Sequence, residues 1–118
     1  MRLHYSVLAQ SSQRTLLKEV RRGDAWKFNA HAGTALVRRN ISIGDARDVI
    51  RTGDFIEYND DFGTRHILLR GESGVCVVVD LDLEEIATVY ANHPDDNHQT
   101  INSSRYLGGV KHGITRGT

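Results

Sequence analysis

The feature that most constrains the fold of this chain is a change in hydrophobic spacing near Gly53. Before Gly53, apolar residues recur every three or four positions, which is typical of an α-helix with one buried face. After Gly53, apolar and polar residues alternate in short runs, which is typical of strands with one buried face. The sequence therefore predicts an α+β domain in which N-terminal helices pack on one face of a sheet.

Three segments have the helical spacing: SSQRTLLKEVRRG, HAGTALVRRN and IGDARDVIRTG. In the first, Ser11 or Ser12 can cap the start of the helix, and Gly23 can end it. The third is the clearest, because Ser42 is a good N-cap and Gly53 follows its end. We expect residues 12–52 to be mainly helical.

Four strands are predicted from the alternating runs, and they lie at residues 55–59, 66–70, 75–80 and 85–90. The connections DDFGT, GESG and DLDLE supply Gly and Asp where turns need them. Because these connections are short, they favour an antiparallel meander of four strands. Residues 3–9 also suit a short strand, although a helix fits them as well.

The composition, with 39% hydrophobic and 25% charged residues, fits one compact domain. We expect a single domain over 1–118, with a core at about 12–92 and a loosely held polar tail at 93–118. Cys76 is the only cysteine, which excludes an intrachain disulfide and predicts a small buried side chain. The chain lacks an apolar stretch of membrane-spanning length and the apolar core of a signal peptide. We therefore expect a cytoplasmic protein, or else a piece of a larger exported one.

The net charge is zero, but the charges are unevenly distributed along the chain. Residues 1–53 hold ten Lys or Arg against four Asp or Glu, whereas residues 54–85 hold two Arg against nine acidic residues. This polarity allows a local basic surface for a phosphate-bearing partner, and an ordinary solvated helix surface fits equally well. Because carboxylates repel phosphate, acidic residues of the strands and turns should lie away from such a surface. They are Asp54, Glu57, Asp60, Asp61, Glu84 and Glu85.

The segment HAGTALVRRN combines a histidine and an arginine on one predicted helix face. His31 and Arg38 are seven residues apart, which is two helical turns, whereas Arg39 lies on the flank. An imidazole exchanges a proton near neutral pH and a guanidinium binds phosphate oxygens, so the pair suits phosphodiester chemistry. On a later strand, His66 and Arg70 share a face, and these two residues and Arg39 could contact a substrate. A histidine near an arginine also occurs by chance in many helices.

The segment IATVYANHPDDNH carries two hydroxyls on a predicted strand. Alternation points Ile86, Thr88 and Tyr90 to one face and Ala87 and Val89 to the other. Thr and Tyr are also residues that strands prefer, so on chemistry alone an ordinary strand explains them better than a site does. The loop that follows has four potential metal ligands, but it reads as solvated surface and we expect no metal there. These ligands are His93, Asp95, Asp96 and His98.

The order HA-x5-RR-N-IS, VIRTGDFIE and RHILLRGESGVCVVVDLDLEEIATVY resembles a family of small bacterial domains. That pattern is also similar to the RNase A-like toxin domains of contact-dependent inhibition systems, in the barnase–EndoU–colicin–RelE ribonuclease group. The resemblance covers roughly residues 28–92, and Asn40 stands where the small family usually has Gly. It implies helices on one face of an antiparallel sheet, with an RNA cleft on the other. It also implies a catalytic set of His31, Arg38, Thr88 and Tyr90.

The function that this resemblance implies is a metal-independent ribonuclease without a cofactor, such as a bacterial toxin that cleaves tRNA or mRNA. His31 would exchange a proton with the ribose 2′-OH or the leaving 5′ oxygen, and Arg38 would hold the phosphate oxygens. Thr88 and Tyr90 would donate hydrogen bonds to the same phosphate, and the product would be a 2′,3′-cyclic phosphate. The expected partners are RNA and an acidic immunity or antitoxin protein, in the cytoplasm of a target cell if the toxin is delivered. The alternative is a noncatalytic RNA- or protein-binding regulatory module on the same scaffold.

Overall fold

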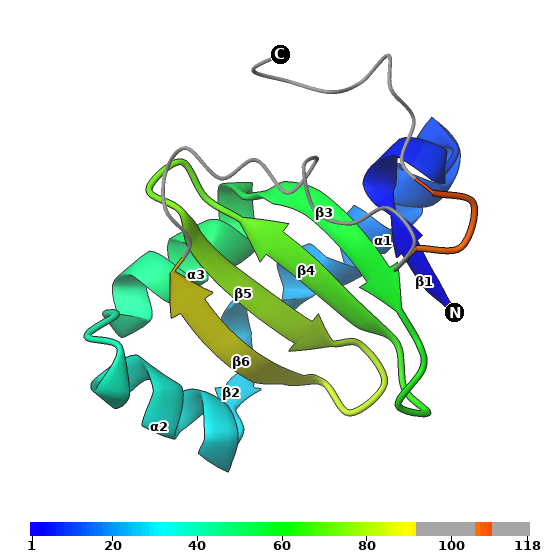
Figure 1. The fold of residues 1–118 in the computed structure, drawn as a ribbon. Coiled ribbons are helices and arrows are strands. Elements are labelled where there is room, and N and C mark those ends of the chain that lie inside the picture. The colour runs from blue at the N-terminus through cyan, green and yellow to red at the C-terminus, as the bar shows by residue number, and fades with distance from the viewer. Residues whose placement is uncertain (92–105, 110–118) are drawn as a thin grey trace.

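The computed structural model describes residues 1–91 and 106–109 of the chain, and within them it shows an α+β fold (Figure 1). The helices are α1 (Gln10–Arg22), α2 (Ala30–Arg38) and α3 (Ile43–Thr52), with short 3₁₀ turns η1 (Tyr5–Val7) and η2 (Gly23–Ala25). The strands are β1 (Arg2–His4), β2 (Lys27–Phe28), β3 (Asp54–Asn59), β4 (His66–Arg70), β5 (Val75–Asp80) and β6 (Glu85–Ala91). The predicted change from helices to strands at Gly53 is confirmed.

The six strands form one sheet in the order β1-β3-β4-β5-β6-β2. The four predicted strands are its centre, and each pairs antiparallel with the next, as expected of a meander. The prediction of a purely antiparallel four-stranded sheet was wrong at both edges. At one edge β1 pairs antiparallel with β3, and at the other β2 pairs parallel with β6. The sheet is therefore mixed.

The helices cover one face of the sheet and one of its edges (Figure 1). α1 and α3 lie behind the sheet, and α2 lies beside β6 and β2. The main hydrophobic core fills the space between the helices and the covered face. Its buried members are Val20, Ala32, Leu36, Ala46, Val49, Ile50, Phe55, Ile67, Leu69, Val75, Val77, Val79, Leu81, Ile86 and Val89.

Helix ends follow the sequence signals in α3 and at the C-terminus of α1, which ends at Gly23 as predicted, but not at the N-terminus of α1. The Ser42 side chain accepts a hydrogen bond from the Asp45 backbone N–H at 3.0 Å, and the helix ends at Gly53, as predicted. In contrast, α1 begins after Ala9 without a side-chain cap, so neither Ser11 nor Ser12 serves as its N-cap. The helix starts at Gln10, earlier than predicted, and the extended residues Leu8 and Ala9 separate it from the η1 turn.

The opposite face of the sheet, called here the open face, carries a second and smaller apolar cluster. Ile56, Leu68 and Cys76 are its buried members, and Val78 and Tyr90 pack against them. The buried position of Cys76 agrees with the sequence prediction.

The predicted tail is described only at residues 106–109. There Tyr106 is buried, and the Leu107 backbone N–H donates to the carbonyl of Arg2 at 2.8 Å. This part of the segment is held against β1, contrary to the expectation of a loosely held tail. The rest of the predicted tail lies outside the described residues. Within the described part of the chain, no helix is long and apolar enough to cross a membrane.

Candidate functional site

A β-bulge in β6 decides which side chains reach the open face. Val78 pairs with Thr88, but the next residue of β5, Val79, pairs with Ile86. Ala87 is therefore an extra residue in β6, and the alternation shifts by one position across it. Ile86 lies in the core beneath the helices, which corrects the prediction that it shares a face with Thr88.

Thr88 lies on the open face, where it lines a hollow together with Leu68 and Val78. Tyr90 lies on the same face, packed against the cluster of Ile56, Leu68 and Cys76. The prediction that the two hydroxyl-bearing residues share the face away from the helices therefore agrees with the structure.

The short strand β2 fixes the start of α2 beside this part of β6. Phe28 of β2 pairs with Ile86, and the Asn29 backbone N–H donates to the Ile86 carbonyl at 2.9 Å. The Asn29 side chain then caps α2 by accepting a hydrogen bond from the Ala32 N–H at 2.8 Å. Two residues after this cap, His31 Nε2 lies 3.1 Å from Thr88 Oγ1, within hydrogen-bonding distance. Residues that are 57 positions apart thus meet at the edge of the sheet.

Two hollows meet at His31. The first, called here the helix hollow, has a volume of about 250 Å³ and is lined by Ala30, His31, Thr34, Ala35, Arg38 and Arg39. The second, called here the sheet hollow, has a volume of about 330 Å³ and lies over the open face. It is lined by Arg2, His31, Glu57, Asn59, Phe62, His66, Leu68, Val78, Ala87 and Thr88. His31 is exposed and borders both, so a bound molecule could occupy both hollows and contact its imidazole.

The two arginines of the helix hollow have different surroundings. Arg39 Nη1 donates to the backbone carbonyl of Val89 at 2.7 Å, which ties the end of α2 to β6. Arg38 is exposed and forms no salt bridge with any residue that the structure describes. The Arg38 guanidinium can therefore turn toward an anion in the hollow. Part of the Arg39 guanidinium is already hydrogen-bonded to the backbone of β6.

Tyr90 differs from the rest of the predicted catalytic set. It lines neither the helix hollow nor the sheet hollow, and its ring is half-buried over Cys76. Burial raises the pKa of the Tyr90 phenol well above its usual range, and Cys76 and Glu57 act in the same direction. Its hydroxyl therefore stays protonated at neutral pH and can act only as a neutral hydrogen-bonding group. The structure places His31 against Thr88 and in the same hollow as Arg38, and it leaves Tyr90 outside both hollows.

Of the two residues predicted on β4, only His66 joins the site. His66 lines the sheet hollow, with Nδ1 at 3.0 Å from the Thr64 carbonyl and Nε2 at 3.4 Å from Asp80 Oδ2. Arg70 lies at the other end of the strand, where it pairs with Cys76, and lines neither hollow. A role for Arg70 in contacting a ligand in these hollows is therefore not supported by its position.

Of the six acidic residues expected to lie away from the phosphate-binding surface, Glu57 is the one that lines the sheet hollow, and it is buried. Arg2 Nε donates to Glu57 Oε2 at 3.0 Å, and the Tyr106 hydroxyl donates to Oε1 at 2.8 Å. Arg2 balances the charge of Glu57, which reduces its repulsion of an anion. Asp54, Asp60, Asp61, Glu84 and Glu85 line neither hollow, as expected.

Besides the apolar residues of its floor, four polar or aromatic residues of the sheet hollow were missed by sequence reasoning: Arg2, Glu57, Asn59 and Phe62. Arg2 pairs with Asn59 through β1, a strand that is only three residues long. The sequence offered a strand or a helix at residues 3–9, and the structure has β1 followed by the 3₁₀ turn η1 there, so the partner of Arg2 could not be read from the sequence. Phe62 was the one detectable signal, since it is a large apolar residue inside the polar turn DDFGT.

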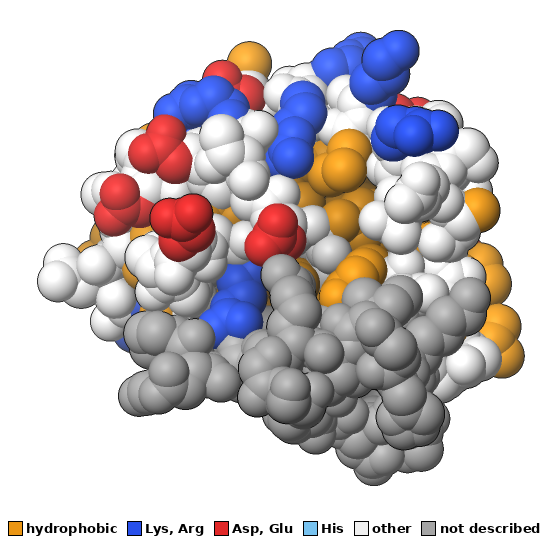
Figure 2. All heavy atoms as spheres, turned by 90° about the horizontal axis from the view of Figure 1, so that it is seen from above, with side chains coloured by type: hydrophobic (Ala, Val, Ile, Leu, Met, Phe, Trp, Pro, Cys, Tyr) orange, Lys and Arg blue, Asp and Glu red, His pale blue; other side chains and the backbone are white. Residues whose placement is uncertain are grey.

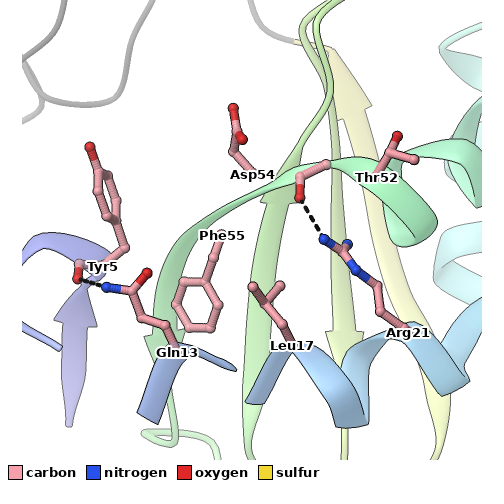
Figure 3. Close-up of a pocket in the computed structure, with 8 residues that line it drawn as sticks. Tyr5, Gln13, Leu17, Arg21, Thr52, Asp54 and Phe55 are labelled. Carbon is pink, nitrogen blue, oxygen red and sulfur yellow. Dashed lines mark hydrogen bonds between the residues drawn. The ribbon is translucent and has the colours of Figure 1, made fainter. Parts of the chain in front are cut away.

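A third hollow of about 440 Å³ lies between α1 and the start of β3, away from His31 (Figures 2 and 3). Apolar side chains form its floor, among them Leu17 and Phe55, and Lys and Arg side chains lie along part of its border. Arg21 donates to the carbonyls of Ile50 at 2.6 Å and Gly53 at 3.3 Å, and burial lowers the pKa of its guanidinium. Arg21 therefore caps the end of α3, which gives it a structural role.

Metal ligands do not gather in the described part of the chain. No group of three or more His, Cys, Asp or Glu side chains could hold a metal ion there. His93, Asp95, Asp96 and His98 lie outside the described residues.

Comparison with known proteins gives no relative from which a function could be taken. No protein-family model, curated protein or solved structure matches this chain.

Proposed function

We propose that the chain is a metal-independent ribonuclease that cleaves RNA through attack of the ribose 2′-OH. The observation that carries this proposal is the 3.1 Å contact between His31 Nε2 and Thr88 Oγ1 where the two hollows meet. Arg38 lines the helix hollow on the same side of α2 as His31. An imidazole, a guanidinium and a hydroxyl lining two adjoining hollows are the groups that a phosphodiester transfer without a metal requires.

The reaction forms a bond between the 2′ oxygen and phosphorus and breaks the bond between phosphorus and the 5′ oxygen. One proton leaves the 2′-OH and one reaches the 5′ oxygen, and the product is a 2′,3′-cyclic phosphate. His31 carries one of these proton transfers, and the other proton is exchanged with water. Arg38 contacts the nonbridging oxygens as negative charge develops on them. Thr88 holds the imidazole before substrate binds and donates to the phosphate afterwards.

Tyr90 has a smaller role in this scheme. Because its pKa is raised and it lies outside both hollows, it does not serve as the base. It supports Thr88 from the neighbouring cluster and reaches the phosphate only through a shift of its hydroxyl. Tyr90→Phe should therefore reduce cleavage less than His31→Ala does.

The biological role that fits this activity is a bacterial toxin acting on tRNA or mRNA and held in check by an acidic partner protein. Supporting this part of the proposal, Arg14, Lys18 and Arg22 are exposed on α1. They form no salt bridge with the residues that the structure describes. A basic surface of this kind attracts an acidic protein or RNA. Expression of the chain without an inhibitor should then arrest growth of the host cell, and His31→Ala should relieve the arrest.

The direct test is cleavage of a single-stranded RNA in the presence of EDTA, followed by mass spectrometry of the products. The wild-type protein should give 2′,3′-cyclic phosphate ends and should leave the all-2′-deoxy oligonucleotide intact. His31→Ala should abolish cleavage and Arg38→Ala should reduce it strongly. Val37→Ala, at an 85% exposed position on the same helix, is the matched control and should cleave normally.

Two results would reject the proposal. The first is cleavage that survives His31→Ala, because the reaction would then come from elsewhere or from a contaminant. The second is the absence of cleavage by the wild-type protein on total RNA. If RNA still bound under that condition, the noncatalytic RNA-binding module would be the better account.

A further inference from the structure

We infer that the sheet hollow is a nucleobase subsite, in which the base next to the cleaved phosphate lies over the open face against Phe62. This inference rests on the proposed function for the position of the phosphate. It adds the substrate class, which is RNA whose base at this position is unpaired and turned out of any stack.

The two hollows differ in charge. This difference favours the phosphate of a nucleotide in the helix hollow and its base in the sheet hollow. Arg38 and Arg39 line the helix hollow, and no acidic residue does. In the sheet hollow, Arg2 is bound to Glu57, so the two opposite charges offset each other. A phosphate is therefore attracted to the helix hollow, whereas a neutral, flat group is better suited to the sheet hollow. His31 and its partner Thr88 lie at the boundary, where the ribose would have to be.

Adjacent strands of the sheet form the floor of the sheet hollow, and most of the side chains there are apolar. Leu68, Val78 and Thr88 lie opposite one another on three adjacent strands, and Ala87 lies beside them. Two strand spacings span about 10 Å, which is enough for a sugar and its base. Pockets for small ligands typically have an apolar lining and a few polar groups, and the sheet hollow has both.

Phe62 provides the aromatic wall. It is 80% exposed in the turn between β3 and β4, although it lines the sheet hollow. Its ring stands edge-on to His66, with the ring centroids 6.0 Å apart and an interplanar angle of 82°. A large apolar ring that is exposed at the rim of a hollow is suited to stacking on a base, since every base has an aromatic face.

Polar groups that line the same hollow can recognise the edge of the base. Asn59 Oδ1 accepts a hydrogen bond from the Asp61 backbone N–H at 2.9 Å, which orients its carboxamide. The amide nitrogen of Asn59 remains a donor toward a base acceptor. His66 is held by the Thr64 carbonyl through Nδ1 and presents its ring beside Phe62. The hollow thus offers stacking with limited hydrogen bonding, which predicts a preference among bases rather than strict selection.

The test compares two RNA substrates that differ only in whether the ribose 5′ to the cleaved phosphate carries a base or is abasic. Phe62→Ala should raise KM for the base-bearing substrate by about 5- to 100-fold. It should not change cleavage of the abasic one. Phe62→Trp should restore the KM, because it restores an aromatic face. Ile43→Ala, which removes an apolar side chain that is 55% exposed at the start of α3, is the matched control and should behave as wild type.

A binding measurement separates failure of this inference from failure of the proposed function. Nucleoside 3′-monophosphates and ribose 3-phosphate are titrated into the protein, and backbone NMR shifts are followed at Val78, Ala87 and Thr88. A nucleotide that binds in a Phe62-dependent way supports the subsite even if no RNA is cleaved. Cleavage that is equal on both substrates and unaffected by Phe62→Ala overturns the subsite and leaves the ribonuclease proposal standing. If neither cleavage nor nucleotide binding occurs, both are rejected.

Discussion

The two faces of the sheet are built from the same strands but have different compositions. On β4, Ile67 and Leu69 point toward the helices and are fully buried, whereas His66 and Arg70 belong to the open face. The covered face is apolar because α1 and α3 leave no water beside it (Figure 1). The open face mixes apolar side chains with groups that can exchange protons or donate hydrogen bonds. We therefore expect substitutions on the covered face to change mainly stability and those around His31 to change mainly function.

The largest effect is expected at Leu69 on the covered face. Leu69→Ala should lower the free energy of unfolding by about 2–5 kcal/mol, because it removes buried methyl groups and leaves a cavity. Val78→Ala, at a half-buried position on the open face, should cost less than about 1.5 kcal/mol. Urea unfolding of both variants measures the difference. Equal losses at the two positions would contradict the contrast between the faces.

A second prediction concerns the close packing of α3 on the sheet. A Cβ added at Gly53 would lie 2.5 Å from the Val49 carbonyl oxygen and 2.9 Å from Val49 Cγ1. Gly53→Ala should therefore destabilise the protein by about 1–3 kcal/mol.

Gly33 on α2 provides the matched control, because a Cβ there meets no heavy atom within 4 Å. Gly33→Ala should raise stability by about 0.5–1 kcal/mol, since Ala restricts the unfolded chain. Thermal unfolding shows whether each substitution raises or lowers the stability. A stabilising Gly53→Ala would show that the junction between α3 and β3 is less tightly packed than described.

A third and smaller effect is expected at the buried carboxylate of the open face. Tyr106→Phe removes the hydroxyl that donates to Glu57 Oε1 at 2.8 Å, and should cost about 1–2 kcal/mol. Tyr5→Phe, which alters a tyrosine that does not line the sheet hollow, is a suitable comparison. A loss at Tyr106 no larger than the loss at Tyr5 would show that water satisfies Glu57 equally well.

The sequence predicted the centre of the fold and missed its edges. The strands β3 to β6 were recognisable because each is at least five residues long and bounded by Gly or Asp turns. β2 has two residues, too few to show a period, and β1 has three, so the alternation at residues 3–9 left its bounds and its place in the sheet undecided. The parallel pairing of β2 with β6 depends on where α2 begins after the Asn29 cap, which is a tertiary relation.

The candidate site was predictable where it depends on local geometry. Helical spacing placed His31 and Arg38 together, and strand alternation placed Thr88 and Tyr90 on one face. The bulge at Ala87 could not be foreseen, because no glycine or proline marks it, and it moved Ile86 to the covered face. The far wall of the sheet hollow could not be predicted either, since it comes from a turn and from the pairing of β1 with β3.

The smallest effect on stability is expected at His31, where the effect on function should be greatest. The side chain is exposed, and the hydrogen bond that the structure shows for it goes to the Thr88 hydroxyl. His31→Ala should therefore change the free energy of unfolding by less than about 0.5 kcal/mol, as is usual for a surface substitution. His4 offers the same substitution in a fully buried setting, and His4→Ala should cost more than about 1 kcal/mol. In urea unfolding, His31→Ala should then be the more stable of the two variants. In RNA cleavage, it should be the less active one. A strongly destabilised His31→Ala would mean that this histidine holds α2 on the sheet, and a loss of cleavage in that variant would be explained by unfolding.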